Sequence, residues 1–434
     1  MKKVVLIVLA VLCAVFLFGF GPGYPNQPAP PGAWSSIGPF GGNICGLARN
    51  PKSPSELYAA SSSYPSQIFR SVNNGSSWTR QSVISAYVYD LAVDPKTSGT
   101  IYLLCDNSVQ VSKDKGKTFS RIALPSGFQG YDGAIAIHPT NPKIIAVCGN
   151  YIYDQANWRS ELSVALTTNG GATWTIKRMS QPVDYGYGRD IAFAKSNPAY
   201  IYVCGFDYKD NKRSARIFVS KNGGSSWTSI GGAAVFQNIS PACFSVHVDP
   251  RDPEKAWVGH YGGIARTSNA GGSWTAQKTT QITNVTALAT DGSNPNILYA
   301  GAQHNYQYAG LKSTDGGSTW TAVTKGLYGE CRRVLAAGPN VHLATRAGVF
   351  RSRNGGAAWA TSHTGIRASS VAALGIAPSS PKTIYAGIYG YALLKTVNGG
   401  AAWAPCPSFS GSDLVASVIV HPTNANTLYV KPSG

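Results

Sequence analysis

Acidic residues are scarce in this chain of 434 residues. Lysine and arginine number 37 and aspartate and glutamate only 19, which gives a formal net charge of +18 at pH 7. A positive field of this size favours anionic partners, although a second interpretation is that the charge serves solubility alone. The sequence contains no basic helix and no RNA-binding signature, so nucleic acid is not an expected partner.

Cysteine and histidine lack the spacings that form disulfide frameworks or bind metals. Outside the N-terminal segment the cysteines are odd in number and have no local pairs. These are Cys45, Cys105, Cys148, Cys204, Cys243, Cys331 and Cys406. We expect them to be small buried apolar fillers. The histidines show no ligand-like spacing, so the sequence predicts no metal and no cofactor.

Helical periodicity is absent from the mature region, and there is one long apolar run near the start of the chain. Lys2 and Lys3 are followed by residues 4–20 without a charge, which is typical of a secretion signal. We predict either a cleaved signal peptide or a retained membrane anchor at residues 1–23, which in the second case tethers the protein to a membrane. A stiff proline-rich spacer follows at residues 24–33. The chain is therefore expected to be exported, as an extracellular, periplasmic or surface-anchored protein.

One short phrase occurs eight times. Each copy has Ser or Thr, then Asn or Asp two residues later, then Gly two residues after that, and an aromatic residue three positions beyond the Gly. This order predicts a tight hairpin turn, because the Asx side chain binds backbone N–H groups and Gly supplies a positive φ. The aromatic ring is expected to fill the gap against the repeat that follows. The Asx and aromatic positions are Asn73 and Trp78, Asp114 and Phe119, Asn169 and Trp174, Asn222 and Trp227, Asn269 and Trp274, Asp315 and Trp320, Asn354 and Trp359, and Asn398 and Trp403.

Strand-like segments surround each phrase. A run such as residues 88–95 leads through a turn to an apolar strand such as residues 101–105. A third strand enters the phrase, and a fourth begins at its aromatic residue. We call these strands A, B, C and D. A four-stranded unit that returns every ~40 to ~55 residues predicts an all-β fold, a multi-bladed β-propeller of four-stranded antiparallel blades.

The number of repeats predicts about eight blades within residues 34–434. Residues 34–38 resemble a lone D strand, and the chain ends with an A strand at 415–420 and a B strand at 428–430. The two termini would then meet in a composite ninth blade. An eight-bladed ring with extra edge strands and a longer parent chain fit the count equally well.

The repeated phrase resembles the Asp-box, or BNR, repeat of sialidase-like, sortilin-like and xyloglucanase-like β-propellers and of the photosystem II assembly propellers. The resemblance runs from about Trp34 to the C-terminus. It implies a propeller fold. These families share the fold but not the chemistry, so the resemblance does not by itself imply one function.

Loops from B to C and from D to the next A lie on one face of a propeller, and in this chain they are rich in aromatic residues. Aromatic faces with polar neighbours form platforms for sugars and small ligands, and Tyr and Arg also dominate protein interfaces. An alternative is that many of these tyrosines simply cover the blade ends. The predicted ligand-binding residues are Tyr151, Tyr153, Trp158, Tyr185, Tyr187, Arg189, Tyr208, Tyr306, Tyr308, Arg332, Arg333 and Tyr389.

Three functions fit the sequence. The first is a non-catalytic module that binds an anionic glycan or protein at the cell surface. The second is a glycoside hydrolase of sialidase-like or xyloglucanase-like type, for which the candidate carboxylates are Asp132, Asp190, Glu330 and Asp413. The Arg-Ile-Pro signature of sialidases is absent, and residues 59–67, where xyloglucanases carry an Asp, contain no carboxylate. The third is an assembly factor that holds a partner protein through an arginine patch. We favour the first.

Overall fold

The computed structural model describes most of the chain as strands and turns, without helices. The described residues are 41–154, 159–179, 183–210, 212–231, 242–278, 282–304, 307–327, 329–362, 364, 367–368, 371–388, 392–406 and 415–432. The expected signal or anchor at 1–23, the spacer at 24–33 and the opening strand at 34–38 lie outside them. Within the described part of the chain, no helix is long and apolar enough to cross a membrane.

Seven four-stranded antiparallel sheets follow one another, each paired in the order of the sequence. The first four are β2 (Ile44–Arg49), β3 (Leu57–Ser61), β4 (Ser66–Ser71) and β5 (Thr79–Ile84); β6 (Val88–Val93), β7 (Ile101–Cys105), β8 (Ser108–Ser112) and β9 (Ser120–Ala123); β10 (Phe128–Ile137), β11 (Ile145–Asp154), β12 (Arg159–Thr167) and β13 (Thr175–Arg178); and β14 (Tyr185–Phe193), β15 (Ile201–Lys209), β16 (Lys212–Ser220) and β17 (Thr228–Gly231). The next three are β18 (Cys243–Val248), β19 (Ala256–His260), β20 (Gly263–Thr267) and β21 (Thr275–Lys278); β22 (Ile282–Thr290), β23 (Leu298–His304), β24 (Gln307–Ser313) and β25 (Thr321–Val323); and β26 (Cys331–Ala337), β27 (Asn340–Thr345), β28 (Gly348–Ser352) and β29 (Ala360–Thr361).

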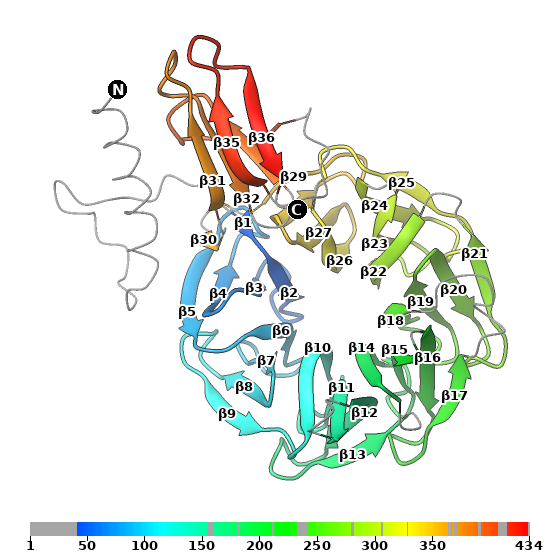
Figure 1. Ribbon diagram of the computed structural model, residues 1–434. Coiled ribbons are helices and arrows are strands. Elements are labelled where there is room, and N and C mark those ends of the chain that lie inside the picture. Colours follow the sequence, from blue (N-terminus) through cyan, green and yellow to red (C-terminus); the bar gives the residue numbers. More distant parts are fainter. Residues whose placement is uncertain are drawn as a thin grey trace. The chain divides into compact units, whose positions relative to one another are not determined.

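These seven sheets close into a ring with their first strands innermost (Figure 1). The ring closes where the seventh sheet meets the first, since β26 and β27 pack against β2. Hydrogen bonds join the two sheets: the backbone N–H of Trp78 donates to the carbonyl of Thr364 at 2.8 Å. His342 Nε2 donates to the carbonyl of Asn74 at 3.0 Å. The multi-bladed propeller is thus confirmed.

An eighth four-stranded sheet is present, but it is not part of this ring. It contains β31 (Val371–Ile376), β32 (Ile384–Ile388), β33 (Ala392–Thr396) and β34 (Ala404–Pro405). A two-stranded sheet of β35 (Val415–Val420) and β36 (Leu428–Pro432) packs against it. The strand expected to join β35 and β36 in a composite blade lies outside the described residues. Separately, β1 (Gly41–Gly42) pairs in parallel with β30 (Arg367–Ala368).

The repeated phrase forms the turn between the third and fourth strands of each of the eight four-stranded sheets. In the first copy Gly75 N donates to Ser71 Oγ at 2.8 Å, and Ser77 N donates to Asn73 Oδ1 at 2.9 Å. The same two bonds recur in the other seven copies. Asn and Asp are interchangeable here because both offer the acceptor oxygen that the turn needs.

The aromatic residue of the phrase packs against the preceding sheet, and not against the following one as the sequence was interpreted. Trp78 Nε1 donates to the carbonyl of Ser362, which follows β29. Trp274 Nε1 donates to the carbonyl of Ile230 in β17. The aromatic residue directly precedes the outermost strand, so its ring reaches back over the edge of the sheet before it.

The seven cysteines outside the N-terminal segment are free thiols, and all but Cys406 are buried. They lie in the apolar layers between neighbouring sheets, where burial raises the pKa of each thiol. Raised thiol pKa values make them unreactive, in keeping with a packing role.

Candidate functional site

Each inner strand of the ring has a break in its pairing close to its first residue. In β6, Val88 pairs with Cys105 and Asp90 pairs with Leu104, so that Tyr89 is left out of the ladder. A one-residue break of this kind also occurs in β2, β14, β18, β22 and β26, whereas in β10 four residues, 130–133, lie opposite Gly149 alone. Such bulges turn a side chain away from the regular alternation of a strand. The residues turned in this way are Cys45, Tyr89, Asp132, Arg189, Phe244, Thr286 and Arg332.

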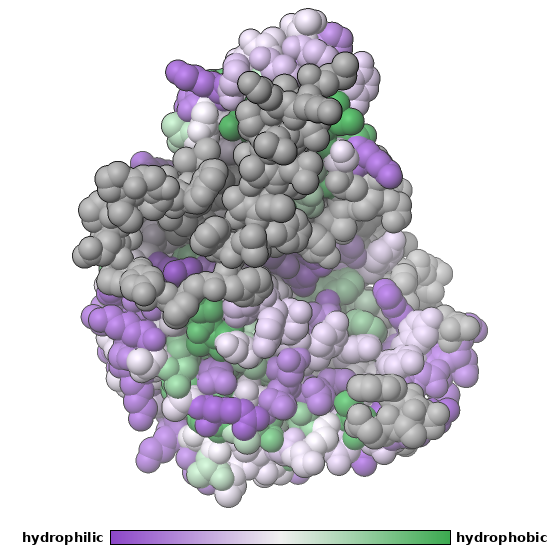
Figure 2. All heavy atoms as spheres, turned by 60° about the vertical axis from the view of Figure 1, so that its left-hand side comes forward, coloured by the Kyte–Doolittle hydropathy of each residue, from purple (hydrophilic) through white to green (hydrophobic). Residues whose placement is uncertain are grey.

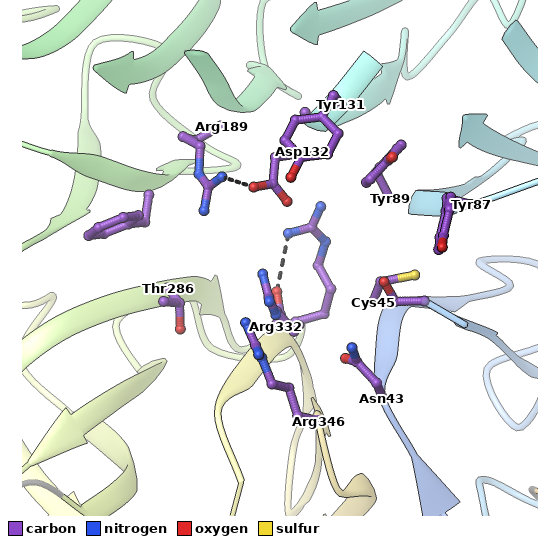
Figure 3. Close-up of a pocket in the computed structure, with 14 residues that line it drawn as sticks. Asn43, Cys45, Tyr87, Tyr89, Tyr131, Asp132, Arg189, Thr286, Arg332 and Arg346 are labelled. Atoms are coloured by element: carbon purple, nitrogen blue, oxygen red, sulfur yellow. Dashed lines mark hydrogen bonds and ion pairs between the residues drawn. The ribbon is translucent and has the colours of Figure 1, made fainter. Parts of the chain in front are cut away.

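All seven bulge residues line one pocket of about 440 Å³ at the centre of the ring. Residues of the B–C loops and the D–A loops complete it, among them Ser62, Tyr87 and Arg346. Figure 3 shows Arg189, Asp132 and Tyr131 facing Arg332 and Arg346 across the pocket. The pocket therefore lies on the loop face that the sequence analysis selected, and it is built jointly by all seven blades.

Arginines from the fourth and seventh blades provide the positive charge of the pocket. Arg189 Nη1 donates to Asp132 Oδ2 at 2.6 Å. Glu330 lies between two arginines, with Nε of Arg346 at 2.8 Å and Nε of Arg332 at 3.5 Å from its carboxylate oxygens. Burial lowers the pKa of Arg332, and the nearby charges of Arg346 and Arg189 lower it further. Ion pairs thus hold these arginines in place with part of their charge compensated.

Asp90 and Asp190 directly follow bulge residues of β6 and β14, and Arg333, which also lines the pocket, contacts Asp90. Arg333 Nη2 lies 2.7 Å from Asp90 Oδ1. Asp90 Oδ2 accepts the N–H of Ile135 at 3.0 Å, and Asp190 Oδ2 accepts the N–H of Val246 at 3.0 Å. The two bonds to backbone N–H groups each join one blade to the next, and the Arg333–Asp90 contact joins the seventh blade to the second. Burial raises the pKa of Asp190 to about 6, although Arg333 opposes the shift.

A second hollow, which we call the aromatic groove, adjoins the central pocket. It has a volume of about 350 Å³ and shares Tyr131, Asp132 and Arg189 with the pocket. Its other lining residues are Tyr185, Tyr187, Phe206, Tyr208 and Arg213. The groove exists because β14, β15 and β16 are nine residues long, whereas β18 has six and β19 and β20 have five each.

The rings of the groove stand in pairs across β14 and β15. The centroids of Tyr187 and Phe206 are 5.3 Å apart, and those of Tyr185 and Tyr208 are 6.3 Å apart. The Arg213 guanidinium lies 5.4 Å from the centroid of Phe206, and that of Arg189 lies 6.0 Å from it on the pocket side. The side chain of Tyr185 is 39% exposed, so a ligand has access to its face.

The structure brings together part of the predicted ligand-binding set. Tyr185, Tyr187, Arg189 and Tyr208 line the groove, and Arg332 and Arg333 line the pocket. Tyr151 and Tyr153 lie on β11, where the Arg178 guanidinium is 5.3 and 5.9 Å from their ring centroids, and they line neither hollow. Trp158, Tyr306 and Tyr389 lie outside the described residues, as does the side chain of Tyr308.

The three candidate carboxylates that the structure describes do not form a free pair. Asp132 and Glu330 are ion-paired with arginines, and Asp190 is buried behind the pocket and bound to backbone N–H groups. Asp413 lies outside the described residues. No group of three His, Cys, Asp or Glu side chains that could hold a metal ion occurs within the described ranges.

The sequence analysis missed the bulge residues Tyr89, Phe244 and Thr286, as well as Arg346. A signal for two of them was present: Tyr89 stands six residues before Pro95, and Phe244 stands six residues before Pro250. The proline marks the end of the inner strand. Counting back from it would have found the same position in several blades.

Comparisons with known proteins agree with this architecture. A family model described as "Sortilin, neurotensin receptor 3" matches residues 66–214. A search of curated proteins finds no match.

Several solved structures share the fold. The GH74 enzyme of Niastella koreensis is 17% identical with a TM-score of 0.58, over 91% of this chain and 70% of that one. The GH74 xyloglucanase of Xanthomonas campestris is 14% identical with a TM-score of 0.58, over 89% and 71%. YCF48 from Cyanidioschyzon merolae is 13% identical with a TM-score of 0.51, over 72% and 96%. At these identities the likeness concerns the fold alone, and with the repeated phrase it identifies the chain as a β-propeller built from Asp-box repeats.

Proposed function

We propose that this propeller is an exported, non-catalytic module that binds an acidic glycan at the cell surface, in the aromatic groove and the adjoining central pocket. The observation that carries the proposal is the open groove in which Tyr185, Tyr187 and Tyr208 stand beside Arg189 and Arg213. Flat rings with polar neighbours suit the apolar faces and hydroxyl groups of a sugar. The signal or anchor at residues 1–23 is part of the same proposal.

Charge favours an acidic ligand. Arg332 and Arg346 approach the pocket from the seventh blade, and Arg189 borders both hollows. The chain as a whole carries a net charge of +18, which steers anions toward it. A carboxylate or sulfate group of a glycan would compete with Glu330 for the two arginines that flank it.

Binding is favoured over hydrolysis because the carboxylates are engaged. An inverting hydrolase needs two carboxyl groups ~6.5–9.5 Å apart, one to protonate the leaving group and one to activate water. Asp132 and Glu330 each neutralise arginines, and Asp190 holds two blades together.

The test is a glycan array probed with the whole chain at low and high salt, with released reducing sugar measured in parallel. We expect salt-resistant binding to particular acidic glycans and no released sugar. Replacing Tyr185→Ala and Tyr187→Ala together should weaken binding about tenfold to a hundredfold, since each aromatic contact contributes ~0.5–1.5 kcal/mol. The matched control is Tyr261→Ala, because Tyr261 is 41% exposed but lines neither hollow.

Two results would overturn the proposal. Unchanged binding by the double tyrosine variant would exclude the groove, and released sugar would favour a glycoside hydrolase with Asp132 and Glu330 as the next residues to change.

A second candidate is an assembly factor that holds an acidic protein. The convergence of Arg189, Arg332 and Arg346 on one pocket supports it. No glycan signal at either salt, together with capture of a protein partner that Arg332→Ala abolishes, would favour this function.

A further inference from the structure

The turns between the A and B strands lie beside the turns of the repeated phrase, which we call the box turns, and together they form one face of the ring. In each of the seven blades a backbone hydrogen bond joins the two kinds of turn. In the second blade Lys115 N donates to the carbonyl of Gly99 at 2.9 Å. Neighbouring blades are also joined on this side, since Asn50 Nδ2 donates to Ser98 Oγ at 2.8 Å. This box face is opposite the loop face that holds the central pocket, because the strands of a blade alternate in direction.

The box face of the first four blades is rich in lysine. Its turns contain eight lysines, no arginine and three acidic residues, which gives a net charge of +5. All eight lysines are exposed. We call this sector of the box face the lysine face. Its turns are residues 50–56, 72–78, 94–100, 113–119, 138–144, 168–174, 194–200 and 221–227, and its lysines are Lys52, Lys96, Lys113, Lys115, Lys117, Lys143, Lys195 and Lys221.

The acidic residues of the lysine face are engaged within the protein. Glu56 is buried and paired with an arginine of its own blade. Asp94 Oδ1 accepts the N–H of Lys96 at 2.7 Å, and Asp114 Oδ1 accepts the N–H of Thr118 at 2.9 Å.

The lysines of this face are largely without ion pairs. Within the described residues, Lys221 alone among them has one, with Glu254 at 3.9 Å. Of the acidic residues in the sequence, Asp413 alone lies outside the described residues. One further carboxylate cannot neutralise the seven other lysines, so the lysine face retains a positive field.

The box face of the fifth to seventh blades has the opposite sign. Its turns contain three basic and five acidic residues, which gives a net charge of −2. A basic surface that served solubility alone would not require this separation of charge. The positive field is therefore concentrated on one side of the ring. The turns of the negative sector are residues 249–255, 268–274, 291–297, 314–320, 338–339 and 353–359.

The chemistry of the lysine face favours many spread anions over one bound anion. A lysine ammonium is a strongly hydrated point charge on a flexible stem, whereas arginine forms the planar paired bonds that recognise a single phosphate or carboxylate. Val72 is the only large hydrophobic side chain exposed in the described turns of these four blades. Figure 2 brings the side of the ring with β5 and β9 forward, and hydrophilic residues lie there among hydrophobic ones. Such a surface suits electrostatic attraction without insertion.

We propose that the lysine face docks the propeller on a bilayer that contains anionic phospholipid. The lysines stand in the turns of four neighbouring blades, and a bilayer presents its headgroup charges over a plane in a matching way. The contact directs the loop face, with its pocket and groove, away from the lipid. Neither the aromatic groove nor residues 1–23 take part in it.

The experiment measures binding of the whole chain to vesicles by flotation. The vesicles are phosphatidylcholine alone or phosphatidylcholine with about one third phosphatidylglycerol, each at ~50 and ~300 mM salt. The test variant combines Lys113→Gln, Lys115→Gln and Lys117→Gln. Each lysine near an anionic surface contributes roughly fivefold, so this variant should bind the anionic vesicles about a hundredfold more weakly at low salt. Wild-type binding to these vesicles should fall at high salt.

The matched control combines Lys209→Gln, Lys212→Gln and Lys325→Gln. These three exposed lysines lie on the loop face, so the control removes the same charge from the opposite side of the ring and should bind like the wild type. Thermal melting shows that both variants are folded. An amine-reactive label gives a second measurement: anionic vesicles should protect Lys113 and Lys117 and leave Lys209 and Lys212 reactive.

Three results would overturn the proposal. Equal binding by the wild type and the folded test variant would exclude the lysine face, and equal losses in the test and control variants would show that only the total charge matters. Binding that is the same for neutral and anionic vesicles would assign the membrane contact to other residues, such as 1–23. None of these results bears on the glycan site, because the binding expected there resists salt and depends on Tyr185 and Tyr187.

Discussion

At the scale of single residues, the residue at the bulge of an inner strand is available for binding, whereas its neighbours in the strand hold the fold together. Tyr89 is left out of the ladder, while its neighbours Val88 and Asp90 keep their partners on β7. A side chain at such a position can change without the loss of a ladder hydrogen bond. The next residue has the opposite role, because Asp90 and Asp190 bind backbone N–H groups of the following blade.

Asp190 gives a prediction about pH. Its pKa is raised to about 6 in the folded protein, above the ordinary value of 3.8. Stability from its neutral form is therefore fully present below about pH 4 and is lost as pH rises through 6, by roughly 3 kcal/mol. We expect Asp190→Asn to be less stable than wild type at pH 4, because it loses a carboxylate oxygen, but to decline less between pH 4 and 7.

Urea unfolding at several pH values measures how the free energy of unfolding changes with pH in the wild type and in Asp190→Asn. Asp252→Asn serves as the control, because Asp252 is exposed in an A–B turn and makes the same chemical change. Parallel curves for Asp190→Asn and wild type would show that Asp190 does not titrate in this range.

The sequence predicted some residues of the site and not others for a physical reason. The sequence assigned Tyr185, Tyr187 and Arg189 to a loop before an inner strand, which topology places on the ligand face; the structure includes all three in β14 at that same face. Phe244 and Thr286 are placed by a bulge, and a bulge depends on how two strands pair, which the sequence of one strand does not reveal. Asp190 was predicted as a candidate acid because the sequence does not reveal the bulge in β14. This bulge directs Arg189 into the pocket and leaves the next residue, Asp190, behind it.

At the scale of strands and turns, the aromatic residue of the Asp box connects its own blade to the preceding one. Trp78 makes this plain where the ring closes, since its indole is buried and its Nε1 donates to the carbonyl of Ser362 at 2.7 Å. The sequence predicted the turn and the four strands of each blade because the phrase fixes them locally. It did not predict the direction in which the ring packs, which depends on contacts between blades.

Replacing Trp78→Ala should lower the free energy of unfolding by about 3–5 kcal/mol, as large-to-small changes in a core do. Trp320→Ala should cost less, because Trp320 is only partly buried. Chemical denaturation measures both. Trp78→Phe is the matched control: it keeps an aromatic ring, although a smaller one, and loses the indole N–H, whose hydrogen bond contributes about 1 kcal/mol. Equal losses for Trp78→Ala and Trp320→Ala would contradict the account of Trp78 as a closing residue.

At the scale of the whole molecule, the contact that closes the ring includes a buried histidine, His342. His342 of the seventh blade donates from Nε2 to Asn74 of the first, and its Nδ1 lies 3.4 Å from Arg49 Nη2, which donates to it. The pKa of His342 is lowered to about 3, chiefly by burial and in addition by the charges of Arg49 and Arg351. A proton on Nδ1 would face the Arg49 guanidinium directly.

Acid should therefore open the ring at this joint. The pKa of His342 in the folded protein lies below its ordinary value of 6.5, so its contribution to stability is present above pH 6.5 and is lost as pH falls toward 3, by roughly 5 kcal/mol in all. His342→Gln keeps a donor for Asn74 but cannot become charged. Denaturation between pH 7.5 and 4.5 should show a shallower loss for this variant.

His247 also lowers stability in acid, in the wild type and in His342→Gln alike, because burial lowers its pKa to about 4. The comparison of wild type with His342→Gln removes that shared part. Identical acid slopes would mean that closure does not depend on the charge of His342.

The pocket draws at least one side chain from an irregularity in the inner strand of each of seven blades, from Cys45 in the first to Arg332 in the seventh. These positions can therefore be exchanged with no change in loop length, although Asp132 and Arg189 form an ion pair and would have to change together. A descendant of this chain could acquire a different ligand by point substitution alone. A library randomised at these seven positions would explore new recognition on an unaltered ring.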